Sequence, residues 1–294
     1  MNSQNNYTLT DKQSGNLAFK ILPFEDNSRF DHIQRYNYYS MLWLLKGEVT
    51  LKADFTSYNV AANNLLSFSP YQPFMLQTED ELKGVAIFFH PDFFCIHKHQ
   101  QEVACNGVLF NNIYEPPYVF IDESSAKTIY HLIEQMKAEI LKPEMAQNDL
   151  LVSYLKILLI TASRLKAEQR DSTFNNTPAN NKQDLLQSLK KLIEEHYKTK
   201  HSAGEYAEML NISRKALAKT TRENLGKTLT SLISERIIIE AKRELYLSDK
   251  PVKQIAYELG YDDEYYFSRF FKTNADISPQ IYRDTVGFGR GQAD

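Results

Sequence analysis

The first third of the chain has the short, alternating hydrophobic pattern of β-strands. Its apolar or alternating stretches are 41–45, 49–53, 65–68 and 84–89. In the second of these, Val49, Leu51 and Ala53 alternate with polar residues, a period of two that is typical of a strand with one buried face. Lys46-Gly47 is a turn candidate before it. Several short strands separated by turns predict a small β-barrel or sandwich.

Two helices are expected after the strands. Residues 126–140 and 149–165 carry apolar side chains at helical spacing, and Lys142-Pro143 separates them. Such a helical hairpin could cover the β-region, a second subunit, or both. The second helix is our candidate dimer interface, with Leu155 and Leu158 as the positions to test.

Polarity divides the chain into domains. Residues 167–182 (AEQRDSTFNNTPANNK) are polar and predict a linker. We expect a sensor and dimerisation domain over 1–166 and a helical domain over 183–286. The glycine-rich end, 287–294, is expected to be disordered.

Composition narrows the class of protein. The chain of 294 residues is 43% hydrophobic and 24% charged, so it can bury ordinary cores. Two cysteines are too few for a disulfide scaffold, and no apolar run reaches the roughly 20 residues of a membrane helix. The polar N-terminus lacks the apolar core of a signal peptide, so we expect a cytoplasmic protein without membrane contact. The net charge is −3, but from Lys182 onward 19 basic residues outnumber 17 acidic ones.

The helical domain expected over 183–286 contains an internal repeat. When Ser213 is set against Asp263, an apolar residue follows four positions later in both units and a basic residue nine positions later. In each unit a first helix contains a small residue, Ala207 or Ala256, that lets a second helix cross closely. Ser213 or Asp263 then caps the second helix. This is helix-turn-helix architecture, in which the second helix can lie in a major groove.

The segment between the repeats predicts one long helix, Thr228–Leu247, with apolar residues on one face. Its twenty residues would span roughly 30 Å at about 1.5 Å per residue. One turn of DNA is about 34 Å. Such a helix can hold two recognition helices in successive major grooves.

Residues Leu185–Arg283 resemble the DNA-binding domain of the AraC/XylS family of regulators. The strongest part is Ile255–Arg283, IAYELGYDDEYYFSRFFKTNADISPQIYR. The resemblance implies an α+β protein: an N-terminal cupin-like β-barrel with a helical hairpin, then an all-α DNA-binding domain with two helix-turn-helix units joined by a long helix. It also implies a dimeric regulator of transcription controlled by a small-molecule effector, with RNA polymerase as a candidate partner.

Two positions depart from the family pattern. Asp276 replaces a usual Gly where a helix ends in the left-handed conformation, which Asp tolerates at modest cost. Thr221 replaces a usual Phe, which should weaken packing of the first recognition helix by about 1–3 kcal/mol.

The outward faces of the two recognition helices supply the candidate contacts to double-stranded DNA. They are Arg214, Lys215, Ala218, Lys219 and Arg222 on the first helix, and Tyr265, Ser268, Arg269 and Lys272 on the second. For Lys272 a phosphate contact and an internal pair stay equally open. Asp262, Asp263 and Glu264 are interpreted as capping and dipole compensation, with a cytosine contact by Glu264 as the alternative.

The N-terminal domain can be a sensor or an enzyme. A cupin enzyme needs metal ligands, and the corresponding positions hold residues such as Tyr36 and Ser40. A second cluster, Cys95, His97, His99 and Cys105 with His90 before it, matches no zinc spacing. We therefore expect no enzyme activity, metal or cofactor.

Aromatic side chains mark the same region instead. Most of them should fill the core, and the effector pocket is expected to include Tyr39 and Trp43. Control by a protein partner stays open as the alternative to control by a small molecule. A cupin enzyme fused to a DNA-binding module is the other alternative.

Overall fold

The computed structural model describes residues 7–11, 15–54, 56–103, 107–142, 144–175 and 181–286. The tail expected to be disordered, 287–294, lies outside them, as does Cys105. The chain divides into two compact units, each of which is described by itself. Unit 1 comprises residues up to Asn112 and from Pro116 to Ser172, and unit 2 comprises Ile113–Glu115 and the residues from Thr173 onward.

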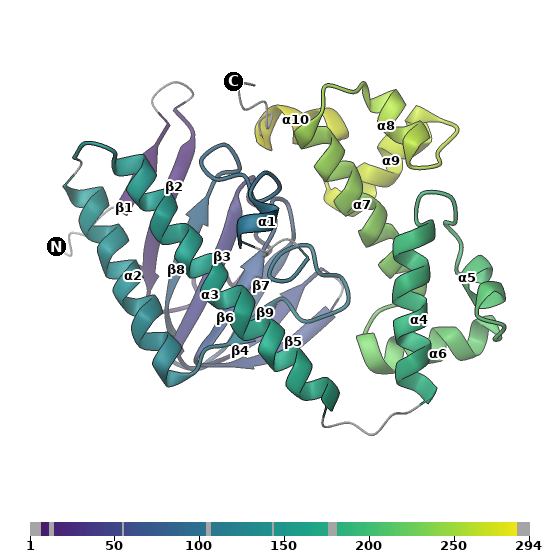
Figure 1. Cartoon of the computed structure of the whole chain (residues 1–294), viewed down its shortest axis with the longest axis horizontal. Coiled ribbons are helices and arrows are strands. Elements are labelled where there is room, and N and C mark those ends of the chain that lie inside the picture. The colour runs from purple at the N-terminus through teal and green to yellow at the C-terminus, as the bar shows by residue number, and fades with distance from the viewer. Residues whose placement is uncertain are drawn as a thin grey trace. The chain divides into compact units, whose positions relative to one another are not determined.

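Unit 1 contains two antiparallel β-sheets (Figure 1). The six-stranded sheet has the order β1-β2-β8-β3-β6-β9, and the three-stranded sheet has the order β5-β4-β7. Their bounds are β1 Tyr7–Thr10, β2 Leu17–Phe24, β3 Tyr39–Lys46, β4 Glu48–Ala53, β5 Thr56–Ala61, β6 Asn64–Phe68, β7 Phe74–Gln77, β8 Lys83–Phe89 and β9 Tyr118–Phe120. The strand predictions at 41–45, 49–53, 65–68 and 84–89 are therefore confirmed.

The two sheets enclose an apolar core. Alternate residues of β3, such as Leu42 and Leu44, contact a buried cluster that also contains Leu51 of β4 and Phe74 of β7. The chain passes from one sheet to the other at Gly47, whose φ of 95° suits glycine and whose position leaves no room for a Cβ beside the Glu81 carbonyl. The α+β class is confirmed, but the described strands form two separate sheets rather than one closed barrel.

Two long helices cover the other face of the six-stranded sheet. They are α2, Glu123–Leu141, and α3, Gln147–Asn175, while a short α1 spans Gln100–Val103. Residues of both long helices, such as Ile133 and Leu155, share one buried cluster with the outward residues of β3 and β8. The helical hairpin therefore packs on its own β-region, one of the two alternatives considered.

The segment expected to be a linker is largely helical in the structure. The boundary between the units, at Ser172 and Thr173, lies inside the expected linker of 167–182. However, α3 continues to Asn175, and α4 already begins at Asn181. Most of this polar segment is therefore helical, because polar composition marks solvent exposure and does not by itself exclude a helix.

Unit 2 is all-helical. Its helices are α4 Asn181–His196, α5 Ala203–Met209, α6 Arg214–Leu225, α7 Leu229–Leu247, α8 Val252–Glu258, α9 Glu264–Ala275 and α10 Pro279–Val286. The long central helix α7 begins one residue after Thr228, whose hydroxyl accepts a hydrogen bond from Ser231 N. This confirms the long helix expected over Thr228–Leu247. No described helix is both long and apolar enough to cross a membrane.

Candidate nucleic-acid interface

The first helix-turn-helix unit consists of α5 and α6. Ser202 and Glu205 form a capping box at the start of α5, and the bonds from the Ser202 backbone and hydroxyl lower the pKa of Glu205 to about 2. Ser213 accepts a hydrogen bond from Ala216 N at the start of α6, as its role as a cap predicts. Gly226 ends α6 in the left-handed conformation.

The inward face of α6 is tightly packed. Leu217 and Thr221 are both fully buried. The Thr221 hydroxyl donates a hydrogen bond to the Ala218 carbonyl at 3.1 Å, so the buried oxygen has a partner. The structure therefore gives no support to the expectation that Thr221 leaves this helix loosely packed.

The outward face of α6 presents the predicted contacts. Arg214, Lys215, Ala218, Lys219 and Arg222 are all exposed. Arg214 lies over Gly204 of α5, where a Cβ would come within 2.5 Å of the guanidinium. The Arg214 side chain is 76% exposed, so its flexible end can move away from such a Cβ.

The second unit consists of α8 and α9. Asp263 accepts hydrogen bonds from the backbone of Tyr265 and Tyr266, so its interpretation as a cap is confirmed. Phe267 and Phe271 are fully buried and anchor α9. At its end Asp276 has a φ of 61°, the left-handed conformation expected for this position.

The exposed face of α9 carries the remaining candidates. Tyr265, Arg269 and Lys272 are exposed, and Ser268 is half-buried. For Lys272, a phosphate contact stays a prediction beside the alternative of an internal pair. All nine candidates therefore lie on two helices whose opposite faces are held in the core.

Helix α7 lies between the two helix-turn-helix units in the chain. Its 19 residues span about 28 Å at about 1.5 Å per residue. Its apolar face is buried, and Ile237, Ala241 and Leu245 are almost fully covered. Such a helix is rigid because its interior side chains fix it on several sides.

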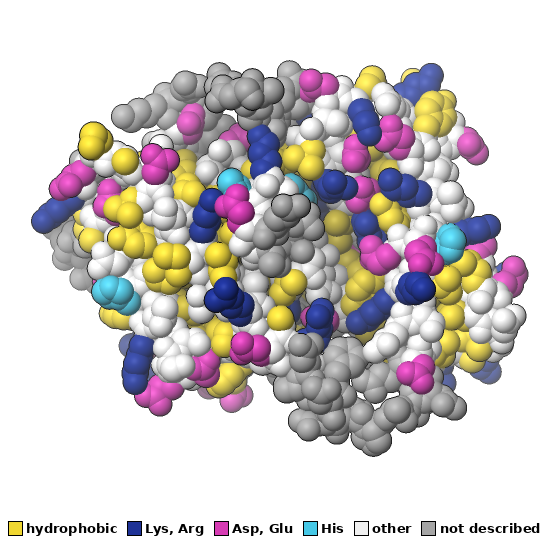
Figure 2. Space-filling model, viewed as in Figure 1, with side chains coloured by type: hydrophobic (Ala, Val, Ile, Leu, Met, Phe, Trp, Pro, Cys, Tyr) yellow, Lys and Arg dark blue, Asp and Glu magenta, His cyan; other side chains and the backbone are white. Residues whose placement is uncertain are grey.

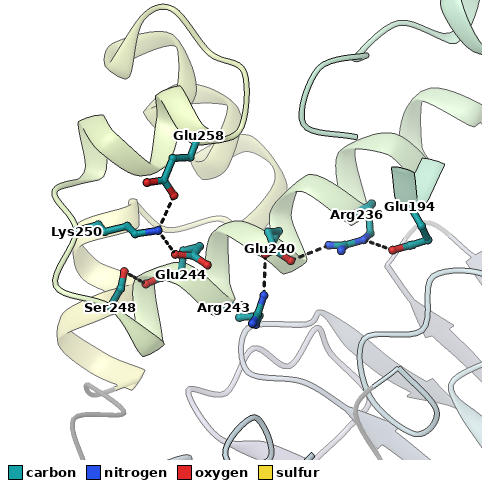
Figure 3. A network of polar contacts seen from close by, with 8 residues as sticks. All are labelled: Glu194, Arg236, Glu240, Arg243, Glu244, Ser248, Lys250 and Glu258. Carbon is teal, nitrogen blue, oxygen red and sulfur yellow. Dashed lines mark hydrogen bonds and ion pairs between the residues drawn. The ribbon is translucent and has the colours of Figure 1, made fainter. Parts of the chain in front are cut away.

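A polar network fixes other helices to α7 (Figure 3). The Arg236 guanidinium donates to Glu194 of α4 at 2.7 Å and to Glu240 at 3.2 Å, and it stacks on the Tyr197 ring. Burial alone would raise the pKa of Glu240, but the positive charges of Arg236 and Arg243 lower it below the usual value. The Arg236–Glu194 pair thus ties α4 to α7, and the ionised Glu240 carboxylate holds Arg236 and Arg243 on α7 itself.

Ion pairs and hydrogen bonds fix the second helix-turn-helix unit to the end of α7. Lys250 bridges Glu244 of α7 and Glu258 of α8, with N···O distances of 2.9 and 2.6 Å (Figure 3). Buried Arg283 donates to the carbonyls of Leu245 and Lys250. These contacts satisfy carbonyls at a helix end and fix the direction of the chain into α8.

Known proteins match this region. A family profile described as a helix-turn-helix domain matches residues 206–285, which run from within α5 through α6, α7, α8 and α9 into α10. The transcriptional activator Btr of Bacillus subtilis is 33% identical over 111 residues, which are 36% of this chain and 21% of Btr. The transcriptional activator RhaS of Citrobacter koseri is 27% identical over 171 residues, 57% of this chain and 58% of RhaS. Residues 206–285 are an AraC/XylS-type helix-turn-helix domain.

These matches cover only part of each activator. The chain spans less than two thirds of the length of either activator. Both are named as activators of transcription, in agreement with the expectation that this chain is not an enzyme. Among solved structures, ToxT from Vibrio cholerae covers 92% of this chain at 16% identity with a TM-score of 0.41, too low for a functional argument.

The residues predicted to bind an effector lie outside the space between the sheets. Tyr39 and Trp43 are buried on the helix-covered face of the six-stranded sheet. Trp43 Nε1 has no hydrogen-bond partner within the described residues. Their part in an effector site stays a prediction. No group of three potential metal ligands is present in the described part of the chain, which includes Cys95 and His90.

Proposed function

We propose that this chain is a sequence-specific DNA-binding regulator of transcription whose two recognition helices enter successive major grooves. The observation that supports this most is the pairing of two exposed polar helix faces, on α6 and α9, through the rigid helix α7. Basic side chains on such faces contact phosphates and guanine edges. Because DNA is the proposed ligand, we also propose a cytoplasmic location and RNA polymerase as a partner.

Lys219 and Arg269 offer the direct test. We expect Lys219→Ala and Arg269→Ala each to weaken binding to a duplex selected from random sequence by about 1–3 kcal/mol, or roughly 5- to 150-fold. A contact to phosphate would also reduce the slope of log affinity against log salt concentration by about one. Lys127→Ala is the matched control, because Lys127 of α2 is 76% exposed and Lys219 is 73% exposed.

Two results would contradict the proposed docking on DNA. If both variants bind the selected duplex with unchanged affinity and salt dependence, the recognition helices do not dock as proposed. If Lys127→Ala weakens binding equally, the effect is one of total charge rather than of position.

We propose a homodimer formed through the exposed side of α3. Leu155 and Leu158, the test positions suggested by the sequence, are fully buried against the β-sheet, so charging them would unfold unit 1. Leu150 and Ile157 are exposed instead, and the half-buried Tyr154, which packs against the same core cluster, lies between them at the i, i+4, i+7 spacing of one helix face. Figure 2 shows hydrophobic side chains over the region of α2 and α3 on this face of unit 1.

Light scattering of purified protein tests this surface. We expect the double variant Leu150→Glu, Ile157→Glu to be a folded monomer at concentrations where the parent chain is a dimer. Ile33→Glu is the control, because Ile33 is an exposed apolar side chain of unit 1 that lies outside α3. A variant that stays dimeric would place the interface elsewhere.

We also propose that unit 1 controls the activity by binding a small molecule. The support is the division into two units, one of which holds the DNA-binding helices while the other has its own core. The alternative, control by a protein partner, would be favoured if the purified full chain bound no small molecule.

A further inference from the structure

A cleft of about 1100 Å³ opens in unit 1 where three segments far apart in the sequence meet. They are the β1–β2 hairpin, the turn after β8, and the connection between α2 and α3. Figure 1 shows the hairpin and this connection at the same end of unit 1. The volume is of the size that takes a small organic ligand.

The polar lining of the cleft is acidic. Asp11 comes from the hairpin, Asp92 from the turn after β8, and Glu144 and Asp149 from the α2–α3 connection. No Lys or Arg is among the described residues that line it. Carboxylates that converge from three segments give the cleft a negative potential, which attracts cations.

The rest of the lining is apolar. Leu17 and Ala18 of β2, Phe93 of the turn and Val152 of α3 contribute hydrocarbon surface. A hydrated metal ion would gain nothing from such a surface, and no group of three metal ligands occurs in the described part of the chain. An organic cation with an apolar body complements both kinds of surface, because its hydrocarbon leaves water while its charge meets carboxylates.

Hydrogen bonds tie together the segments that line the cleft. His90 is buried, and its backbone N–H donates to the Ala18 carbonyl at 2.9 Å. Its ring Nδ1 accepts a hydrogen bond from the backbone N–H of Asp92 at 3.3 Å. On the other wall, the Gln147 amide donates to the Glu139 carbonyl at 2.7 Å, which ties the start of α3 to α2. A site that is ordered before binding loses less entropy when it binds.

We infer that this cleft binds a primary organic amine with an apolar body, and that this amine is the effector of the chain. The second part rests on the proposed function. Asp149, in the first turn of α3, lines the cleft, and Leu150 beside it belongs to the proposed dimer surface. We expect amine binding at Asp149 to stabilise the conformation of the first turn of α3 that binds the amine more tightly. Because Leu150 belongs to the same turn, this shift in conformation changes how strongly the chain dimerises.

Calorimetry on the full chain tests the site. The probes are phenethylamine, putrescine, agmatine and spermidine, and 3-phenylpropanoate is a control with a similar apolar body and the opposite charge. We expect saturable binding of at least one amine with one site per chain, and none of 3-phenylpropanoate. Asp92→Asn and Asp149→Asn should each weaken the amine at least fivefold. Glu79→Gln, which removes an exposed acid outside the cleft, should leave it unchanged.

Two results would overturn the inference: no amine of the panel binds at millimolar concentration, or binding is indifferent to Asp92→Asn and Asp149→Asn. The two variants lie on different walls, so misfolding of one, detected by Trp43 fluorescence, leaves the other as the test. DNA binding is measured separately with the selected duplex. A chain that binds DNA but no amine refutes this inference alone, and a chain that binds amine but no DNA refutes the proposed function.

Discussion

Gly260, in the turn of the second helix-turn-helix unit, is the position where one added carbon should cost most. Its φ is 80°, and a Cβ there would lie 2.1 Å from the Lys198 carbonyl oxygen. A left-handed conformation costs a residue other than glycine about 1–2 kcal/mol. Forcing the carbonyl away adds about 1–3 kcal/mol, the range for overpacking. We therefore expect Gly260→Ala to lower the free energy of unfolding of unit 2 by about 2–5 kcal/mol.

Gly107→Ala is the matched control. Gly107 has a φ of 78°, and nothing lies within 4 Å of the position of its Cβ, so the variant carries the conformational cost without the clash. The chain has a single tryptophan, Trp43 in unit 1, so fluorescence reports on that unit. Circular dichroism in urea adds the helices of unit 2.

The two optical signals should separate the variants. Gly260→Ala should shift the dichroism transition of unit 2 and leave the Trp43 transition in place. Gly107→Ala should lower the Trp43 transition by about 1–2 kcal/mol. DNA affinity should fall in Gly260→Ala as well, because Tyr261 packs between His201 and Phe267 of the recognition helix. If Gly260→Ala costs no more than Gly107→Ala, the contact with Lys198 does not constrain the turn and the reasoning fails.

Three further outcomes test the AraC-type domain. Because the pKa of Glu205 is lowered to about 2 in the folded state, its stabilisation is complete above about pH 4.5 and is lost as the pH falls towards 2; Glu205→Gln should flatten the unfolding free energy over that window, and an unchanged slope would contradict the capping box. Glu240→Ala should cost about 3 kcal/mol in urea unfolding, since it removes a buried partner of Arg236, whereas a cost below 1 kcal/mol would show that Glu194 suffices. Asp276→Gly should raise the melting temperature of unit 2, because glycine avoids the cost of the left-handed conformation, and a decrease would show that the Asp276 side chain is stabilising.

The helix-turn-helix units were predictable because their signals are local. Ser213 and Asp263 cap the helices that follow them, and Leu217 and Phe267 recur four residues later on the buried face. A cap and a helical period both act within a few residues, so the sequence alone displays them.

The β-unit was less predictable because its contacts are not local. Tyr39 and Trp43 were expected to line a pocket inside a barrel, but the sheet presents them to α2 and α3. Alternation shows that the two faces of a strand differ, and it does not say which layer covers each face. The apolar positions of α3 show the same limit. They include both buried and exposed residues, and the sequence does not show that Leu155 is one of the buried ones.

The strand order of the larger sheet bears on how the chain folds as it is made. Phe19 of β2 pairs with Phe89 of β8, and Leu65 of β6 pairs with Val119 of β9. Pairings over such sequence separations must close long loops before any contact is gained, which slows folding. The sheet also lacks its cover until α3, with Leu158 and Ala162, has left the ribosome. Nascent chains that stop before this helix should therefore expose apolar sheet surface and depend on chaperones, although they contain every strand.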